Sequence, residues 1–373
     1  MKRKLIFFLI ISCLFSFKCS AEEIDTNEIY REQYELSSAS ELDKSLPEST
    51  KEFFEQNGID PENPNWVNEF TSQNVFSHIW DFLKTGAKKP IAAAFAILAV
   101  IIISAALGGM EIGNSSSSAA MYATVLSVAA VICVPVFSVI TASVNAMKGC
   151  AVFMIAFIPV FAVIVASAGS AVTSVSMSAL LLGAAQVVSY ISNFVVVPLL
   201  GGFLSISIAT SVSPLLSRSG IADGIKKLAF WIMSLLTTVF IGILSIQTAV
   251  NASADTLATK TAKFVVGSAV PVAGAVLSEA LTTVTASMGM LKASVGVYGV
   301  VACCVIFLPL LTELIIWKVM LVLNAVVSDL FSQTKISALL RSVDTVVSVI
   351  IGIILLTCAM FVISLSIVVG QKA

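Results

Sequence analysis

Long apolar runs fill most of the chain after residue 90. Six of them approach or exceed twenty residues, the length that an α-helix needs to cross the hydrocarbon core of a bilayer. These predicted spans cover residues 90–109, 119–146, 177–209, 228–250, 294–327 and 343–369. The third and fifth are long for a single crossing, so we expect each to be tilted, broken near its proline, or extended beyond the bilayer.

Shorter segments before three of these runs are apolar on one helical face only. Residues 75–89 carry Phe76 and Trp80 on one side, with charged residues off that face. Residues 213–227 and 328–342 show the same pattern. Because each segment immediately precedes a long apolar run, we expect amphipathic helices in the bilayer interface that lead into spanning helices.

Two proline-containing apolar segments resemble each other. Residues 151–179 match residues 263–291 in their small residues and in the placement of Ser and Thr. The alignment pairs Pro159 with Pro271 and, further along, Pro198 with Pro309, at offsets of 112 and 111 residues. We therefore predict an internal two-fold repeat, as is common in membrane transport proteins.

The sequence leaves open how these proline segments meet the bilayer. If they re-enter, each copy has two full spans and the copies run parallel; if they cross, each has three and the copies are inverted. Backbone that leaves the helical conformation in hydrocarbon must face protein or water, so matched interruptions point to a translocation path. Close packing of proline-kinked helices is the competing explanation.

Candidate pathway residues are the prolines, the small residues beside them and the acids within the spans. A carboxylate in a spanning segment is costly unless it is paired or faces water. Glu279 is such a carboxylate, unless the chain turns there and Glu279 lies at the membrane interface. Lys318 follows Glu313 at a spacing poor for a direct pair, so we expect its side chain to snorkel. The candidate set is Pro159, Pro271, Gly267, Gly274, Glu279, Pro198, Pro309 and Glu313.

Composition supports a membrane protein over a soluble one. Apolar residues make up 58% of the chain, charged residues 12%, and the mean hydropathy is +1.00, whereas soluble domains are about a quarter charged. Of the 22 acids, 15 lie before residue 90. The charges that remain are too few to solvate a soluble surface, and no basic stripe suggests nucleic acid binding. The predicted fold class is an all-α, polytopic helical membrane protein.

The N-terminus predicts export. Residues 1–21 have the basic start, apolar core and small-residue exit of a signal peptide, with an uncleaved anchor as the alternative. Residues 22–74 form an acidic exported segment with too few apolar residues for a core of its own, so we expect short helices and partial disorder. The remaining units are an interfacial helix (75–89), first membrane helices (90–146), repeat A (147–250), and repeat B with the C-terminal helix (251–373). The basic residues at 218, 226, 227, 335 and 341 favour a cytoplasmic position for their loops.

Nothing in the sequence predicts an enzyme. His78 is the only histidine, which excludes a histidine-based triad or metal site, and no glycine-rich phosphate loop occurs. The seven cysteines lack metal-binding spacing and suit apolar packing. We predict no catalytic, cofactor-binding or metal-binding residues, so energy from a nucleotide would have to come from another chain.

These features together resemble the stage III sporulation protein AE family of endospore-forming bacteria. The most specific stretch is KFVVGSAVPVAGAVLSEALTTVTASMGMLKASVGVYGV at residues 263–300. The resemblance implies a permease-like component of the mother-cell membrane around the forespore, in a channel complex that supports forespore gene expression and spore development. It implies as partners the other stage III A-series proteins, including a cytoplasmic ATPase and ring-forming exported domains, and a forespore-side channel protein. The exported segment would face the intermembrane space.

Two other functions fit the same pattern. A stand-alone secondary transporter would also show repeats, broken spans and an intramembrane acid. A non-conducting membrane scaffold for an exported assembly would need the exported segment and the spans, but no path for a solute.

Overall fold

The computed structural model describes residues 26–69, 72–109, 114–168, 172–212, 220–254 and 274–370. The N-terminal part holds α2 (Thr26–Leu36), the 3-10 turns η1 (Ala39–Glu41) and η2 (Asp43–Ser45), α3 (Glu48–Asn57) and α4 (Trp66–Glu69). The long helices are α5 (Ser72–Gly109), α6 (Asn114–Ser167), α7 (Val172–Ile191), α8 (Val197–Val212), α9 (Gly220–Ala254), α11 (Gly274–Leu330) and α12 (Thr334–Gly370). A π-helical turn, η3 (Ser192–Val196), joins α7 to α8.

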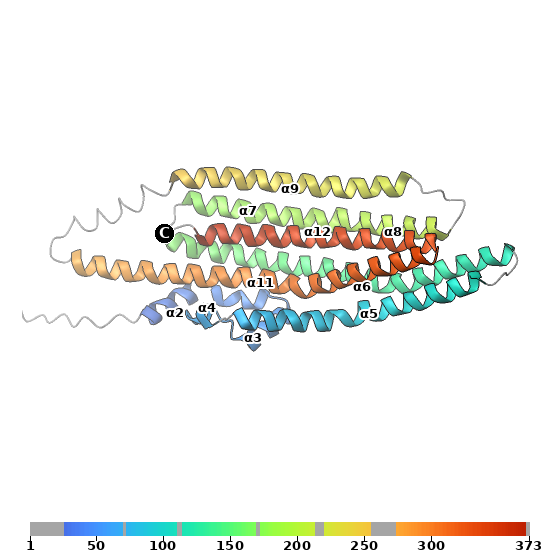
Figure 1. Cartoon of the computed structure of the whole chain (residues 1–373). Helices are drawn as coiled ribbons and strands as arrows, with labels where there is room; N and C mark the ends of the chain where they lie inside the picture. The colour runs from blue at the N-terminus through green and yellow to red at the C-terminus, as the bar shows by residue number, and fades with distance from the viewer. Residues whose placement is uncertain are drawn as a thin grey trace, which may run out of the picture.

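The long helices form an elongated bundle in which α7 continues through η3 into α8 and the other neighbours along the chain run in opposite directions (Figure 1). Within the described residues, six helical stretches are long and apolar enough to cross a membrane, with α7, η3 and α8 counted as one, and they overlap the six predicted spans in order. The all-α, multi-pass architecture predicted from hydropathy is therefore confirmed. Its physical basis is that a helix pairs all of its backbone polar groups within one segment, which hydrocarbon demands.

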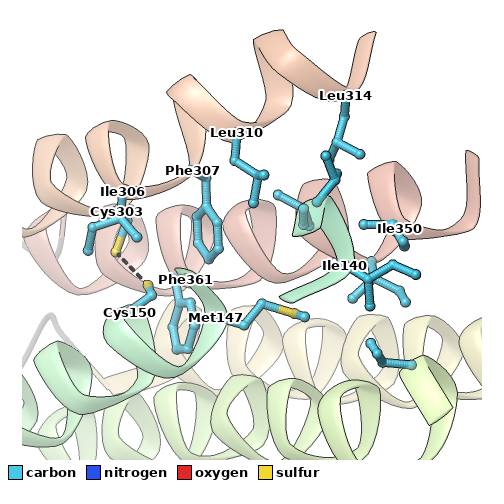
Figure 2. Packing of buried hydrophobic residues seen from close by; sticks show 14 of the residues in the cluster. Ile140, Met147, Cys150, Cys303, Ile306, Phe307, Leu310, Leu314, Ile350 and Phe361 are labelled. Carbon is cyan, nitrogen blue, oxygen red and sulfur yellow. Dashed lines mark hydrogen bonds between the residues drawn. The ribbon is translucent and has the colours of Figure 1, made fainter. Parts of the chain in front are cut away.

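Helix α11 is the centre of the packing. It contacts α12, α5 and α6 as well as the N-terminal helices α2, α3 and α4, whereas α9 lies at the edge against α7 and α8 (Figure 1). Figure 2 shows the interior where α6, α11 and α12 meet, filled by Met147, Phe307, Leu310 and Phe361. At the same level the thiols of Cys150 and Cys303 lie 3.8 Å apart. The cysteines here are packing residues, as expected.

The first proline segment differs from the prediction. Residues 151–167 are the end of α6, which runs as one helix through Pro135 and Pro159. They therefore do not form a helix of their own. Of the second segment, residues 263–273 lie outside the described residues, and the rest is the start of α11. Helices α8 and α11 run in the same direction, and so do α9 and α12, whereas α6 runs opposite to α11 (Figure 1). The repeat itself stays a prediction.

The predicted interfacial helices are not separate elements. Residues 75–89 are the first part of α5, which continues through Pro90 into the span. Residues 328–342 are instead a corner, because α11 ends at Leu330 and α12 begins at Thr334. Ser332 there adopts a left-handed conformation (φ 57°), and Arg341 closes the corner through an ion pair with Asp329 at 2.6 Å. Of the segment 213–227, residues 220–227 are the first turns of α9.

The acidic N-terminal segment folds against the bundle over residues 26–69. It has few apolar side chains, and these gain a core by packing on α11 and α6: Phe54 meets Tyr298 edge-on, with ring centroids 4.9 Å apart. Trp66 is 1% exposed and donates from Nε1 to Ser294 Oγ at 2.8 Å. Residues 26–69 contain the short helices that we expected, and residues more than 200 positions away supply the core that the segment lacks by itself.

Further polar contacts fix this segment. Ser287 Oγ donates to Gln33 Oε1 at 3.0 Å, and the Tyr30 hydroxyl donates to the carbonyl of Pro61 at 2.7 Å. Burial raises the pKa of Tyr30 to about 12, and burial beside Asp60 raises the pKa of Tyr34 as well. Both phenols are therefore neutral donors at physiological pH.

Candidate functional site

A departure from regular α-helix lies immediately before Pro198. Proline has no N–H to donate to the carbonyl four residues earlier, and its ring clashes with that carbonyl. The chain responds with a wider turn over residues 192–196, in which the N–H of Val197 bonds to the carbonyl of Ser192. Single π-helical turns of this kind are frequent at functional sites.

Buried polar side chains cluster at this turn. We call Gln186, Ser189, Ser192 and Asn193 the polar seam; three of them, Gln186, Ser189 and Asn193, recur at helical spacing on one face. The two serines are no more than 1% exposed and Asn193 is 9% exposed. Each of the four residues has a buried oxygen without a hydrogen-bond partner in the protein: Gln186 Oε1, Ser189 Oγ, Ser192 Oγ and Asn193 Oδ1.

These unpartnered oxygens determine what the polar seam can bind. A buried polar group left without a hydrogen bond costs about 1–3 kcal/mol, so four of them within eight residues are a local energetic defect. Gln186 uses its amide nitrogen on the carbonyl of Ala151 in α6 at 3.3 Å, which holds α7 against α6. The free oxygens beside it can bind water or a polar solute inside an apolar bundle.

Glu313 and Pro309 line a cavity of about 330 Å³ between α5, α6 and α11. Gly86 of α5 is part of the lining and lies close to α11, because a Cβ there would be 3.4 Å from the backbone of Glu313. Lys89 and Thr85 share the lining. The acid predicted from the sequence thus faces a lysine-bearing helix across a cavity. Helix α11 continues through Pro309, so the predicted break is absent there.

Lys318 does not behave as predicted. Instead of snorkelling, its ammonium donates to Asp344 Oδ1 at 2.9 Å and to Ser348 Oγ at 2.5 Å, both on α12. An ion pair between two apolar helices offsets part of the cost of placing either charge there alone. This contact helps to hold α11 and α12 together, the most extensive helix pair of the bundle.

The other predicted positions are not brought together into one site. Pro159 lies on the exposed side of α6, and the helix passes through it without a break; a fixed φ near −65° suits a helix, so only one backbone hydrogen bond is lost. Gly274 is the first residue of α11, and Glu279 lies in its second turn, with side chains outside the described part. Gly267 and Pro271 lie outside the described residues.

Sequence reasoning missed the polar seam and Asp344. The signal for the seam was present as polar residues at helical spacing inside an apolar run, beside a proline that was singled out. Lys292 was also missed; it is 3% exposed on α11 in the stretch that α2–α4 cover. Among the residues that the structure describes, no group of His, Cys, Asp and Glu side chains is arranged to hold a metal ion.

The chain is similar in sequence to known proteins. It is 27% identical over 190 residues to the stage III sporulation protein AE of Bacillus subtilis (strain 168), a match that covers 50% of this chain and 47% of that relative. No solved structure matches the fold. The sequence model of the stage III sporulation protein AE family matches residues 65–372, which is most of the chain. Six apolar helices and this match together show that the chain is a multi-pass membrane protein belonging to the stage III sporulation protein AE family.

Proposed function

We propose that this protein is a permease-like component of the stage III sporulation complex that links mother cell and forespore, and that it is needed for forespore gene expression and spore development. Its partners are the other stage III A-series proteins, including a cytoplasmic ATPase and ring-forming exported domains, together with a forespore-side channel protein. Family membership supports the sporulation role. The observation that carries the permease-like role is the polar seam, because a purely structural bundle gains nothing from buried polar atoms without partners.

The proposed orientation puts α2–α4 in the intermembrane space. Lys226, Lys335 and Arg341 gather at the opposite end of the bundle, where α9 and α12 begin. Basic residues beside spanning helices favour the cytoplasm, so this orientation agrees with an N-terminal segment that a signal peptide exports.

The experiment separates function from stability. Alanine at Ser189 and Ser192 and leucine at Asn193 remove unpartnered oxygens, so the triple variant should be as stable as the parent or more so. If the seam carries a solute or water, the same variant should lower expression from a late forespore reporter in sporulating cells while its amount in the membrane is unchanged. The matched control is Ser205→Ala with Ser234→Ala, two exposed hydroxyls on α8 and α9. Normal reporter expression in the seam variant would refute the permease-like role.

A non-conducting scaffold is the second candidate, and two observations favour it. The space between α6, α11 and α12 is filled by apolar side chains (Figure 2), and the N-terminal segment is docked firmly enough to present a fixed acidic surface. For a scaffold, detaching that segment with Trp66→Ala should abolish recruitment of exported partners, while the seam variant should recruit them and sporulate normally.

A further inference from the structure

A cavity of about 440 Å³ lies between α8, α9 and α12, at the end of the bundle opposite α2–α4. Lys226, Lys335 and Arg341 contribute three cations to its lining, against the single carboxylate of Asp223. The described protein after residue 90 is poor in charge, so three cations around one cavity are a local concentration. Neither the polar seam nor the cavity of Glu313 includes any of these residues.

The three cations differ in the contacts that they already make within the protein. Arg341 is bound to Asp329 at 2.6 Å and to Ser337 Oγ at 3.2 Å, which fixes its guanidinium in place. Lys335 Nζ lies 4.2 Å from the centroid of the Tyr122 ring. A cation–π contact orients an ammonium without neutralising it. Lys226 is half-buried on the first turns of α9. Two lysine charges, held on separate helices, therefore face the cavity, with Asp223 offsetting part of that charge.

The remaining lining suits an anion with several oxygens. Hydroxyl groups come from α8 and α12, namely Ser207, Thr210, Ser211, Thr334, Ser342 and Thr345. Several now donate to carbonyls of their own helices, as Ser211 does to Ser207, and a hydroxyl rotates easily to a better acceptor. The first turns of α9 and α12 also border the cavity, and helix N-termini carry partial positive charge.

We propose that this cavity binds a phosphate-bearing anion, held by Lys226 and Lys335 and by the hydroxyls of α8 and α12. Two sources share this chemistry: the headgroup of an anionic phospholipid and a free phosphate compound. Beyond Lys226, the surface of α9 continues as exposed Leu228, Phe230 and Trp231. A lipid whose headgroup entered the cavity would thus have an apolar surface for its chains, as basic pockets between membrane helices offer.

The test uses the full-length protein purified in neutral detergent. The variant Lys226→Gln/Lys335→Gln removes the two free cations, and Lys88→Gln/Lys148→Gln removes the same charge from exposed positions elsewhere. Thermal unfolding is followed during titration with phosphatidylglycerol, with phosphatidylcholine, and with inorganic phosphate against chloride at constant ionic strength. For the parent and the control, phosphatidylglycerol or phosphate should raise the midpoint; the cavity variant should need about tenfold more of the same anion, as expected from losing charge-assisted contacts.

The separate titrations distinguish a phospholipid headgroup from a free phosphate compound as the bound anion. A response to phosphatidylglycerol that phosphate does not reproduce assigns a lipid, and a response to phosphate alone assigns a free anion. Lys226→Arg/Lys335→Arg keeps both charges and should keep the response, which excludes simple damage to the fold. Should Lys226→Gln/Lys335→Gln not fold, Lys226→Gln alone is titrated in its place. An equal response of parent and lysine-to-glutamine variant, or an equal response of the parent to both lipids with none to phosphate, would overturn the proposal.

Discussion

Gly299 of α11 packs directly against Phe157 of α6, and replacing it tests the core directly. A Cβ at Gly299 would lie 2.7 Å from Cε2 and Cζ of Phe157 and 3.3 Å from Cδ1 of Leu365. Carbon atoms prefer separations of about 3.5–4.0 Å, so the ring would have to move by the better part of an ångström. It has little room, because Phe157 is buried between Phe153 and Phe161, with ring centroids 5.5 and 5.1 Å away.

We expect Gly299→Ala to destabilise the protein by about 1–3 kcal/mol, the usual cost of overpacking a filled core. The matched control is Gly289→Ala on the same helix, where a Cβ meets nothing within 4 Å. There alanine should be neutral or should stabilise by up to about 1 kcal/mol, since it favours helix more than glycine does.

The assay is thermal unfolding of the purified protein in one detergent, with both variants measured beside the parent. Combining Gly299→Ala with Phe157→Leu should restore part of the loss, because the shorter side chain yields the space that the new methyl group needs. If Gly299→Ala and Gly289→Ala unfold at the same midpoint, or if the double variant shows no coupling, then α6 and α11 do not pack as described.

Three further predictions concern single contacts. Trp66→Ala should release the N-terminal segment and raise its rate of proteolysis, whereas Trp66→Phe, which keeps an aromatic ring but loses the hydrogen bond to Ser294, should have a smaller effect; equal rates would contradict the docking. Lys318→Gln and Asp344→Asn should each lower the unfolding midpoint, while the double variant should lose less than the two singles together; additive losses would exclude the pair. Mild oxidation should join Cys150 to Cys303 in the folded protein, as peptide mass analysis can show, since their sulfurs already lie 3.8 Å apart; a failure to cross-link would argue against this contact.

Hydropathy predicted the number and order of the spanning helices because an apolar run has only one way to satisfy its backbone in lipid. It did not predict their ends. The second span was predicted to end at residue 146, yet α6 runs on to Ser167. Lys148 is exposed, and Gly149 gives room for Pro47 of the N-terminal segment, whose Cγ would be 3.1 Å from a Cβ there. The contact at Gly149 is a tertiary one that no local pattern shows.

The same limit applies to the candidate site. Glu313 was predicted from its charge alone, and the structure adds the facing Lys89 and the cavity between them. The sequence did not single out Asp344, because this residue lies near the start of a predicted span, where an acidic side chain is interpreted as part of the helix terminus. For the polar seam, spacing could have shown that Gln186, Ser189 and Asn193 share a face. Only the surrounding helices decide that their oxygens find no partner, and that is the feature on which the proposed function depends.

Helix length leads to a last prediction, about where the bilayer lies. At 57 residues, α11 is about 85 Å long, nearly three times the hydrocarbon core of about 30 Å. The acidic helices α2–α4 cover its first half, so that half should lie beyond the hydrocarbon, because their carboxylates require water. In a background without native cysteines, Ala293→Cys, exposed on α11 beside these helices, should react with a membrane-impermeant maleimide, and Val322→Cys, exposed further along, should not. The apolar face that α6 presents at the level of Tyr298, with Val152 and Ile155 exposed, would then have to be covered by protein rather than lipid. Protection of both cysteines would instead put the docked N-terminal segment at the level of the lipid.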